Sequence, residues 1–438
     1  MKVNDNYDAD ILIAGMGVAG SILAYNLKKA GFRILGIEKG AGEDVRTVWT
    51  NEVPADVLDS LLLKDIDIKE EFTPEITAVV DQEGKTAFYV DTNRFIKSLD
   101  MRHFVISFRM AAEKSGAEIM YNSHISGVKT GNDYVLSEIK KGKNKVIIKS
   151  NYLIDCTGIE SPVRKNYFKD EIADSDFIYA LRYRFRADRK KINEFWDRHK
   201  LAYNSAMLRL SENGGFNTTA VYPDINSEKV EILAGGSDRK IKRRIAEIIK
   251  REFGISFNPV NGGGGIIPVR RPFLRLYKNR VFSIGDSGSM IYPMCASGVS
   301  TIIKASEILL DAFKTDDPFL FQRRFNSLIA SEYALMAFFR KIIEEADKED
   351  AKVLFDLVMN PVSIKYVFEN RSVVNPENII LSLKRGTRLF ARPNLLKKAG
   401  IYLLAGSLDS ILYSALSSER RADLISLLES RIIKLFTR

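Results

Sequence analysis

A glycine-rich turn near the start of the chain limits the folds that this sequence can adopt. The turn reads Gly15-Met-Gly17-Val-Ala-Gly20 and follows a compact apolar run over residues 9–14. That run is typical of a buried parallel strand, and a helical pattern continues from the turn to Ala30. Residues 32–37 then predict a second strand. Strand, turn, helix and strand within about thirty residues predict the β-α-β unit that opens a doubly wound α/β sheet.

Each glycine of this turn has a physical role in binding a dinucleotide. The three positions allow a tight turn, a close approach of backbone to pyrophosphate, and close packing of helix on strand. The helix start offers free N–H groups and partial positive charge to the diphosphate. Glu38, at the end of the second strand, can accept hydrogen bonds from the ribose hydroxyls. We therefore predict dinucleotide binding, the alternative being a glycine-rich turn in an unrelated α/β protein.

A second motif favours FAD over NAD as the dinucleotide. Residues 280–284 form an apolar strand that ends in Gly285-Asp286, and Ser297-Gly298-Val299 then opens a helix to about Phe313. An acid at a strand end can bind the ribitol hydroxyls. A helix start aimed at the flavin ring stabilises negative charge on the reduced cofactor. Gly-Asp alone is a common turn, so the prediction depends on the helix behind it and on the first motif.

Together with Gly264-Gly-Ile-Ile-Pro268 and Pro293-x-x-x-Ser297-Gly298, these motifs resemble the geranylgeranyl reductases, within the wider para-hydroxybenzoate hydroxylase-like flavoproteins. The resemblance runs, with gaps, from about Asp8 to Phe313. It implies an α/β fold with a Rossmann-type FAD-binding domain, an inserted antiparallel-sheet substrate domain and a helical C-terminal region.

The pattern of expected elements and the resemblance together divide the chain into interleaved segments. The expected FAD-binding domain comprises residues 1–75, 101–175 and 262–316. The expected substrate domain comprises residues 76–100 and 176–261, and residues 317–438 are expected to be mostly helical.

The resemblance also implies which residues bind FAD. The matching positions are Gly15, Gly17, Ala19, Gly20, Glu38, Gly158, Gly285, Asp286, Pro293, Ser297, Gly298 and Val299. The family also uses an arginine at the helix after the third strand, and both Arg94 and Arg102 fit that position. Arg46 matches an arginine that follows the ribose acid, and its alternative is a surface charge.

The loop between Gly-Asp and Ser297 is expected to lie at the flavin ring, which makes Tyr292 and Cys295 candidates for a catalytic role. We interpret Cys295 as a small structural residue, because a reactive thiol needs a lowered pKa and exposure. Cys156 is interpreted as a packed core residue. Only two cysteines in 438 residues argue against a disulfide framework, and their spacing predicts no metal site.

One stretch departs from the family pattern at the expected substrate pocket. The reductases carry a Tyr-x-Trp-x-Phe-Pro motif that lines their lipid cavity. The matching residues here are Thr218, Ala220, Tyr222 and Pro223. Two large aromatic side chains are absent, so the pocket is expected to be wider or differently shaped, which weakens the prediction of a prenyl-lipid substrate.

The chain is basic, with a formal charge of +10. Such a charge suits a phosphorylated cofactor, a nucleic acid or an acidic membrane surface, or it is simply a solvated surface. The basic residues are spread along the chain and form no nucleic-acid-binding motif, so we expect no nucleic acid partner.

The sequence shows no secretory peptide and no apolar stretch long enough to span a membrane, which predicts a cytoplasmic protein. The apolar segments 399–416 and 424–436 are typical of helices that pack into a fold, and such helices can also contact a membrane surface or cap a cavity.

The leading hypothesis is an FAD-dependent oxidoreductase that reduces carbon–carbon double bonds of an isoprenoid or other apolar substrate by hydride transfer from reduced flavin. NAD(P)H or a small redox protein would donate the electrons, and no second nucleotide motif is apparent. The rivals are an FAD-dependent monooxygenase, a lycopene cyclase-like flavoenzyme without net redox change, and a prenyl-binding chaperone such as the GDP-dissociation inhibitors. The retained Gly-Asp and flavin-loop residues speak against the chaperone.

Overall fold

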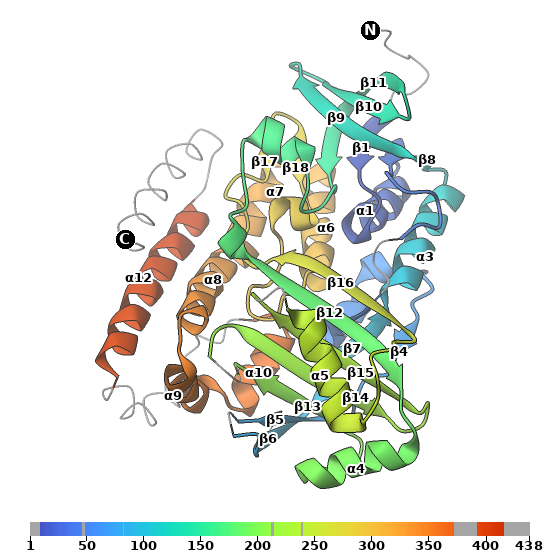
Figure 1. The fold of residues 1–438 in the computed structure, drawn as a ribbon. Coiled ribbons are helices and arrows are strands. Elements are labelled where there is room, and N and C mark those ends of the chain that lie inside the picture. Colours follow the sequence, from blue (N-terminus) through green and yellow to red (C-terminus); the bar gives the residue numbers. More distant parts are fainter. Residues whose placement is uncertain are drawn as a thin grey trace.

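The computed structural model describes residues 9–45, 49–81, 83–211, 214–237, 240–371 and 392–415. Arg46 and the segment 424–436 lie outside the described residues. Figure 1 shows two large sheets, one toward each end of the molecule, with the C-terminal helices along one side. This arrangement confirms the expected α/β FAD-binding fold with mixed sheets and a helical C-terminal region.

The first sheet is built on the predicted β-α-β unit. Strand β1 (Ala9–Ala14) leads into α1 (Val18–Lys29) and then into β2 (Ile34–Ile37), which pairs with β1 in parallel. β11 (Asn144–Asp155) pairs in parallel with the other edge of β1, so β1 is an interior strand of the sheet. The residues of β1 and β2 are also almost all buried, as their apolar runs predict.

The eight strands of this sheet come from widely separated parts of the chain. Its main path is β17-β18-β11-β1-β2-β8, and the hairpin β9-β10 joins it at β11. The remaining strands are β8 (Glu118–Met120), β9 (Ser123–Thr130), β10 (Val135–Lys141), β17 (Tyr277–Lys278) and β18 (Val281–Ser283). Helices α3 (Met101–Lys114) and α6 (Val299–Lys314) pack against α1.

The strand-like run expected from residue 118 to 128 is two strands rather than one. The chain breaks at Asn122, whose φ of 55° lies in the left-handed region that asparagine tolerates. β8 pairs with β2 in parallel, whereas β9 turns away to pair with β10. The break thus separates the parallel nucleotide-binding layer from an antiparallel hairpin.

The second sheet has seven strands in the order β16-β12-β15-β14-β13-β5-β6 and is mostly antiparallel. Its members are β5 (Ile76–Val80), β6 (Thr86–Asp91), β12 (Phe177–Arg186), β13 (Ser205–Leu210), β14 (Asn217–Asp224), β15 (Lys229–Gly236) and β16 (Asn261–Pro268). Helices α4 (Arg189–His199) and α5 (Ile241–Phe253) pack their apolar residues onto one face of this sheet. The opposite face remains available for a cavity.

The structure differs in two places from the expected division into FAD-binding and substrate domains. Residues 262–268, assigned above to the FAD-binding domain, form most of β16 and pair with β12 in the second sheet. In addition, β3 (Thr50–Pro54) and β4 (Glu70–Glu71), from segment 1–75, pair with β7 (Ile96–Asp100) in a small third sheet. Short strands of mixed composition carry little periodicity, which is why this sheet was not predicted.

The C-terminal region is helical, as expected. It contains α7 (Pro318–Phe325), α8 (Ser331–Glu344), α9 (Lys348–Val358), α10 (Pro361–Phe368) and α12 (Pro393–Ala415). The described part of the apolar segment beginning at residue 399 belongs to α12, which packs along α8. Arg271 anchors this helix through an ion pair with Asp409 at 2.9 Å. Within the described ranges, no helix is both long and apolar enough to cross a membrane.

Candidate functional site: a flavin cradle and an adjoining cavity

The glycine turn is enforced by close backbone contacts. Gly15 has a φ of 89°, and a Cβ added there would lie 2.4 Å from the carbonyl oxygen of Cys156. A Cβ at Gly20 would lie 1.8 Å from the carbonyl oxygen of Gly15. No larger residue fits at either position without moving the backbone. By contrast, a Cβ on Gly17, which caps α1, would meet open space, so the front of the turn is free for a ligand.

Glu38 is held at the end of β2 by three donors. Its carboxylate accepts hydrogen bonds from the backbone N–H of Met16 and of Gly40, both at 2.9 Å, and from Nη2 of Arg109 at 3.1 Å. A carboxylate has about four acceptor positions, so one remains for a ribose hydroxyl. The geometry is compatible with the expected role of Glu38.

Arg109 is a site residue that the sequence interpretation missed. Its buried guanidinium also donates to the carbonyl oxygens of Met16 at 2.7 Å and of Gly42 at 3.0 Å. It therefore joins the glycine turn, the ribose acid and the loop after β2. A charged residue on the apolar face of α3, next to Phe108 and one turn from Val105, was the signal available in the sequence.

The structure separates the two candidate arginines. Arg102 lies in the first turn of α3, and its Nη2 is 3.4 Å from the carbonyl oxygen of Glu43, in the loop that Arg109 also contacts. Arg94 lies on the short helix α2 (Thr92–Phe95), exposed and next to the ring of Phe95. Arg102 thus lies at the start of a helix and next to the loop after β2, whereas Arg94 contacts neither in the part of the chain that the structure describes.

The second motif meets the first at the start of α1. A Cβ added to Gly285 would lie 3.1 Å from the Cβ of Ala19, which places the Gly-Asp turn against the first turn of that helix. Burial raises the pKa of Asp286 to about 6, and the positive charge of Arg164 opposes this rise. Asp286 is the second residue of a short 3-10 helix that spans Gly285–Gly288.

The turn after β11 completes the cradle. The buried carboxylate of Asp155 accepts hydrogen bonds from Thr157 and Ser161, which shape the turn that contains Gly158. Behind it lies the buried guanidinium of Arg164, whose Nη2 donates to the carbonyl oxygen of Ile159. Its Nε and Nη1 have no partner within the described ranges. A buried cation with unused donors beside an open glycine turn fits a diphosphate-containing cofactor.

The loop between residues 292 and 297, which we call the flavin loop, is closed on itself. The N–H of Tyr292 donates to the carbonyl oxygen of Ser297 at 2.8 Å, and Ala296 adopts a φ of 58°. Pro293 is buried within the loop. Helix α6 begins immediately afterwards at Val299, with Gly298 as its N-cap, so its free N–H groups lie next to the loop.

Asn370, which was not predicted, fastens the flavin loop to the C-terminal helices. Its Nδ2 donates to the Oγ of Ser297 at 3.3 Å and also to the Oγ of Ser300. Its Oδ1 accepts from the thiol of Cys295 at 3.2 Å. Asn370 follows α10 and lies more than seventy residues along the chain, so sequence spacing carried no signal for this contact.

The two catalytic candidates have different positions. Tyr292 is fully buried, donates its hydroxyl to the carbonyl oxygen of Arg371 at 2.6 Å, and does not line the cavity described below. Cys295 lines that cavity, and it is an exposed free cysteine. Burial raises the pKa of the Cys295 thiol to about 12, so it stays protonated at neutral pH. The buried Cys156 also has a raised pKa.

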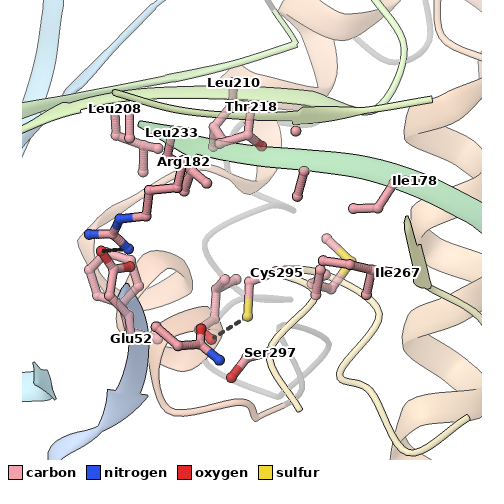
Figure 2. A pocket seen from close by; sticks show the side chains of 18 of the residues that line it. Glu52, Ile178, Arg182, Leu208, Leu210, Thr218, Leu233, Ile267, Cys295 and Ser297 are labelled. Carbon is pink, nitrogen blue, oxygen red and sulfur yellow. Dashed lines mark hydrogen bonds and ion pairs between the residues drawn. The ribbon is translucent and has the colours of Figure 1, made fainter. Parts of the chain in front are cut away.

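A cavity of about 250 Å³ lies between the second sheet, the flavin loop and the C-terminal helices. Figure 2 shows Leu208, Leu210 and Leu233 on one wall, with Cys295 and Ser297 opposite. Of the predicted pocket residues, Thr218, Ala220 and Tyr222 line it, whereas Pro223 does not. Pro223 is the next residue along β14, and successive side chains of a strand point to opposite faces.

The apolar wall is interrupted by one charged group of residues. Glu52 on β3 and Arg182 on β12 both line the cavity, and Nη1 of Arg182 lies 3.2 Å from Oε1 of Glu52. Arg182 also pairs with Glu231 on the neighbouring strand β15. The ring of Tyr222 lies 4.8 Å from the guanidinium carbon of Arg182. This charged group was not predicted, because each member lies on a different strand.

The fold and this cradle define a flavin nucleotide-binding enzyme of the doubly wound class. The chain belongs to the FAD binding domain family, whose model matches residues 8–310. FAD is accordingly the cofactor, and the cradle residues described above fit it.

Known reductases of prenyl lipids are among its relatives. The chain is 22% identical to the digeranylgeranylglycerophospholipid reductase of Methanocaldococcus jannaschii, over 72% of this chain and 80% of the relative. It is 21% identical to digeranylgeranylglycerophospholipid reductase 1 of Methanopyrus kandleri, over 70% of this chain and 82% of the relative.

Solved structures of both reductase-like and monooxygenase proteins share the fold. A geranylgeranyl bacteriochlorophyll reductase-like protein from Thermoplasma acidophilum has a TM-score of 0.68 at 18% identity, covering 90% of this chain and 99% of that one. The p-nitrophenol 4-monooxygenase PnpA from Pseudomonas putida has a TM-score of 0.59 at 17% identity, covering 86% and 98%. These comparisons support the resemblance to the geranylgeranyl reductases and leave the reaction open.

Proposed function

We propose that this flavoenzyme reduces carbon–carbon double bonds of an isoprenoid or similarly apolar substrate. The observation that carries the proposal is the position of the cavity. Many of its lining side chains are aliphatic, and the flavin loop contributes Cys295 and Ser297 to the walls. An apolar molecule in this space would therefore lie against the loop that is expected to contact the flavin ring.

The residues of the chain bind, orient and exclude water, and bound FAD in its reduced form supplies hydride. Leu208, Leu233 and Ile267 offer an apolar surface to a hydrocarbon chain. Because the Cys295 thiol stays protonated at neutral pH, it can donate a hydrogen bond but is a poor nucleophile. This favours a reaction in which the cofactor, rather than a covalent enzyme intermediate, carries the chemistry.

The proposal includes partners. Reducing equivalents would come from NAD(P)H or a small redox protein, since no second nucleotide motif is apparent in the sequence. A long isoprenoid is poorly soluble in water, so peripheral contact with a membrane would be its route to the enzyme. The basic charge of the chain would favour an acidic membrane surface.

Monooxygenation is the second candidate, because the p-nitrophenol 4-monooxygenase shares the fold over 86% of this chain. Such an enzyme would consume oxygen and NAD(P)H and would insert one oxygen atom into its substrate. A lycopene cyclase-like reaction would change the substrate without net electron transfer. These alternatives make different demands on oxygen and on electrons, which allows one experiment to separate them.

The experiment begins with the absorption spectrum of the purified protein, followed by anaerobic reduction and addition of geranylgeraniol or a digeranylgeranyl phospholipid. The reductase predicts that lipid alone reoxidises the flavin and that the product gains two hydrogens per double bond. Reoxidation that requires oxygen and yields a hydroxylated product would instead establish the monooxygenase. A colourless protein that does not bind added FAD would refute the enzyme and favour the prenyl-binding chaperone.

Two neighbouring residues provide a matched pair of variants. Ile267 lines the cavity, whereas the adjacent Ile266 is 44% exposed on β16. We expect Ile267→Trp to fill the cavity and abolish reoxidation by lipid while FAD content stays unchanged. Ile266→Trp adds the same bulk outside the cavity and is expected to leave reoxidation intact. Equal behaviour of the two variants would place the substrate elsewhere.

A further inference from the structure

Three side chains from three different strands meet at one wall of the cavity. They are Glu52 on β3, Arg182 on β12 and Tyr222 on β14, and we call them the polar subsite. Figure 2 shows Glu52 and Arg182 in contact at one end of the space that Cys295 also faces. Charged groups are costly to bury in a cavity whose other lining residues are uncharged, so their arrangement constrains what can bind there.

The polar subsite is one end of a longer chain of ion pairs. Arg182 pairs with Glu231 as well as with Glu52, and Arg184 pairs with Glu231 at 2.9 Å and with Glu71 at 3.1 Å. Three carboxylates thus share two guanidiniums. Lys69 extends the chain from Glu71 at 3.1 Å to Asp100 at 3.0 Å, adding one cation and one carboxylate and leaving the balance unchanged. The whole network therefore carries one excess negative charge.

The excess charge is exposed to the cavity mainly through Glu52. Its side chain is 22% exposed, against 7% for Arg182 and 10% for Glu231. The guanidinium of Arg182 is turned toward its two carboxylates, and Arg184 does not line the cavity. An anionic group of a ligand would therefore meet a carboxylate first, and like charges in a desolvated site repel strongly.

Tyr222 contributes a neutral hydroxyl to the same place. Burial together with the nearby charge of Glu52 raises the pKa of the phenol well above its usual value, so the hydroxyl stays protonated. A carboxylate has about four acceptor positions. Arg182 occupies one of them, which leaves Glu52 with capacity for a further donor, and the phenol oxygen of Tyr222 can itself accept a hydrogen bond.

We propose that the polar subsite binds a hydroxyl group of the substrate, so that the enzyme prefers an isoprenoid alcohol, or another apolar molecule with a hydroxyl, over an anionic phosphate ester. This inference rests on the proposed function and specifies the substrate class of the same cavity. Glu52 accepts the hydroxyl proton in a hydrogen bond, and Tyr222 provides the second contact. Fixing the hydroxyl at this wall also fixes which carbons of the hydrocarbon chain lie at the flavin loop.

Binding of three matched ligands tests the proposal on the FAD-loaded protein. The probes are farnesol, farnesyl methyl ether and farnesyl monophosphate, which share one hydrocarbon chain and differ in the terminal group. Trp49 lines the cavity, so tryptophan fluorescence can report their binding. We expect farnesol to bind about tenfold or more tightly than the ether, since the ether lacks the donor for a charge-assisted hydrogen bond. The phosphate is expected to bind more weakly still.

The variants assign this preference to particular groups. Glu52→Gln and Tyr222→Phe are each expected to reduce the preference for alcohol over ether, and Glu52→Gln is also expected to improve phosphate binding. Glu71→Gln is the matched control, because it removes a carboxylate from the same network at a position that does not line the cavity. FAD content and thermal unfolding of each variant show whether it is folded, and Tyr222→Phe removes no charge.

Several outcomes overturn the proposal. They are equal binding of alcohol and ether, tighter binding of the phosphate, no binding of any probe, or full retention of the preference in both Glu52→Gln and Tyr222→Phe. The proposed function fails differently. If farnesol binds with the expected preference yet no prenyl substrate reoxidises the reduced flavin without oxygen, the polar subsite is supported and the proposed reductase activity is refuted. If a prenyl lipid reoxidises the flavin but the protein binds the alcohol no more tightly than the ether, the reductase activity is supported and the polar subsite is refuted.

Discussion

Arg109→Met removes the guanidinium that connects the parts of the nucleotide cradle. The side chain is 4% exposed and donates hydrogen bonds to Met16, Gly42 and Glu38 at 2.7, 3.0 and 3.1 Å. Breaking a buried ion pair by removing one partner costs about 3–5 kcal/mol. Because Glu38 keeps two backbone N–H donors, we expect the lower end, about 3 kcal/mol of lost unfolding free energy.

The same change is expected to weaken FAD binding by at least about tenfold, because the glycine turn and the ribose acid both depend on Arg109 for their positions. Urea unfolding of the apoprotein measures the first effect, and quenching of flavin fluorescence in an FAD titration measures the second. Lys114→Met, on the exposed face of the same helix, is the control and is expected to change stability by less than about 0.5 kcal/mol. If Arg109→Met unfolds at the same urea concentration and binds FAD like the original protein, the proposed role of this clamp is wrong.

Three further predictions concern single groups of the site. Because burial raises the pKa of Cys295 to about 12, iodoacetamide at pH 8 should leave it unmodified in the folded protein and alkylate it in denaturant, which peptide mass spectrometry can show. Burial raises the pKa of Asp286 from 3.8 to about 6, so the folded apoprotein holds a proton that the unfolded chain releases. Its contribution to stability should therefore decline as the pH rises from about 4 to 6, and urea unfolding at both ends of this range should show a smaller decline in Asp286→Asn. Asn370→Leu leaves the buried hydroxyls of Ser297 in the flavin loop and Ser300 in α6 without this donor and should cost about 2 kcal/mol in urea unfolding. A visible circular dichroism spectrum of bound FAD that is unchanged in this variant would argue against a role for Asn370 in positioning the loop.

The nucleotide half of the molecule was largely predictable because its contacts are local. β1, the glycine turn and α1 follow one another directly, and Glu38 reaches back to Met16 across one β-α-β unit. Each step depends on glycine conformation, apolar runs and helix starts, which act over a few residues. The same reasoning located Gly285-Asp286 and the start of α6.

The features that depend on pairing between distant segments of the chain could not be predicted in the same way. The third sheet joins β3 and β4 to β7, and none of these strands has a clear alternation of its own. Residues 262–268 contain four consecutive glycines and were assigned by resemblance, although their partner β12 places them in the second sheet. The contact of the Tyr292 hydroxyl with the carbonyl oxygen of Arg371, 79 residues along the chain, likewise had no signal in the sequence.

By itself, the sequence determined the FAD-binding fold and the cofactor, because a dinucleotide cradle is built from backbone N–H groups and glycine turns whose geometry neighbouring residues dictate. Only the tertiary structure decided the shape and charge of the substrate cavity. Glu52, Arg182 and Tyr222 lie on three strands of two sheets. Asn370, which follows α10, contacts the flavin loop although it lies 75 residues along the chain from Cys295. Which buried charge faces which partner depends on strand register and sheet packing, and register emerges only when the whole core is assembled.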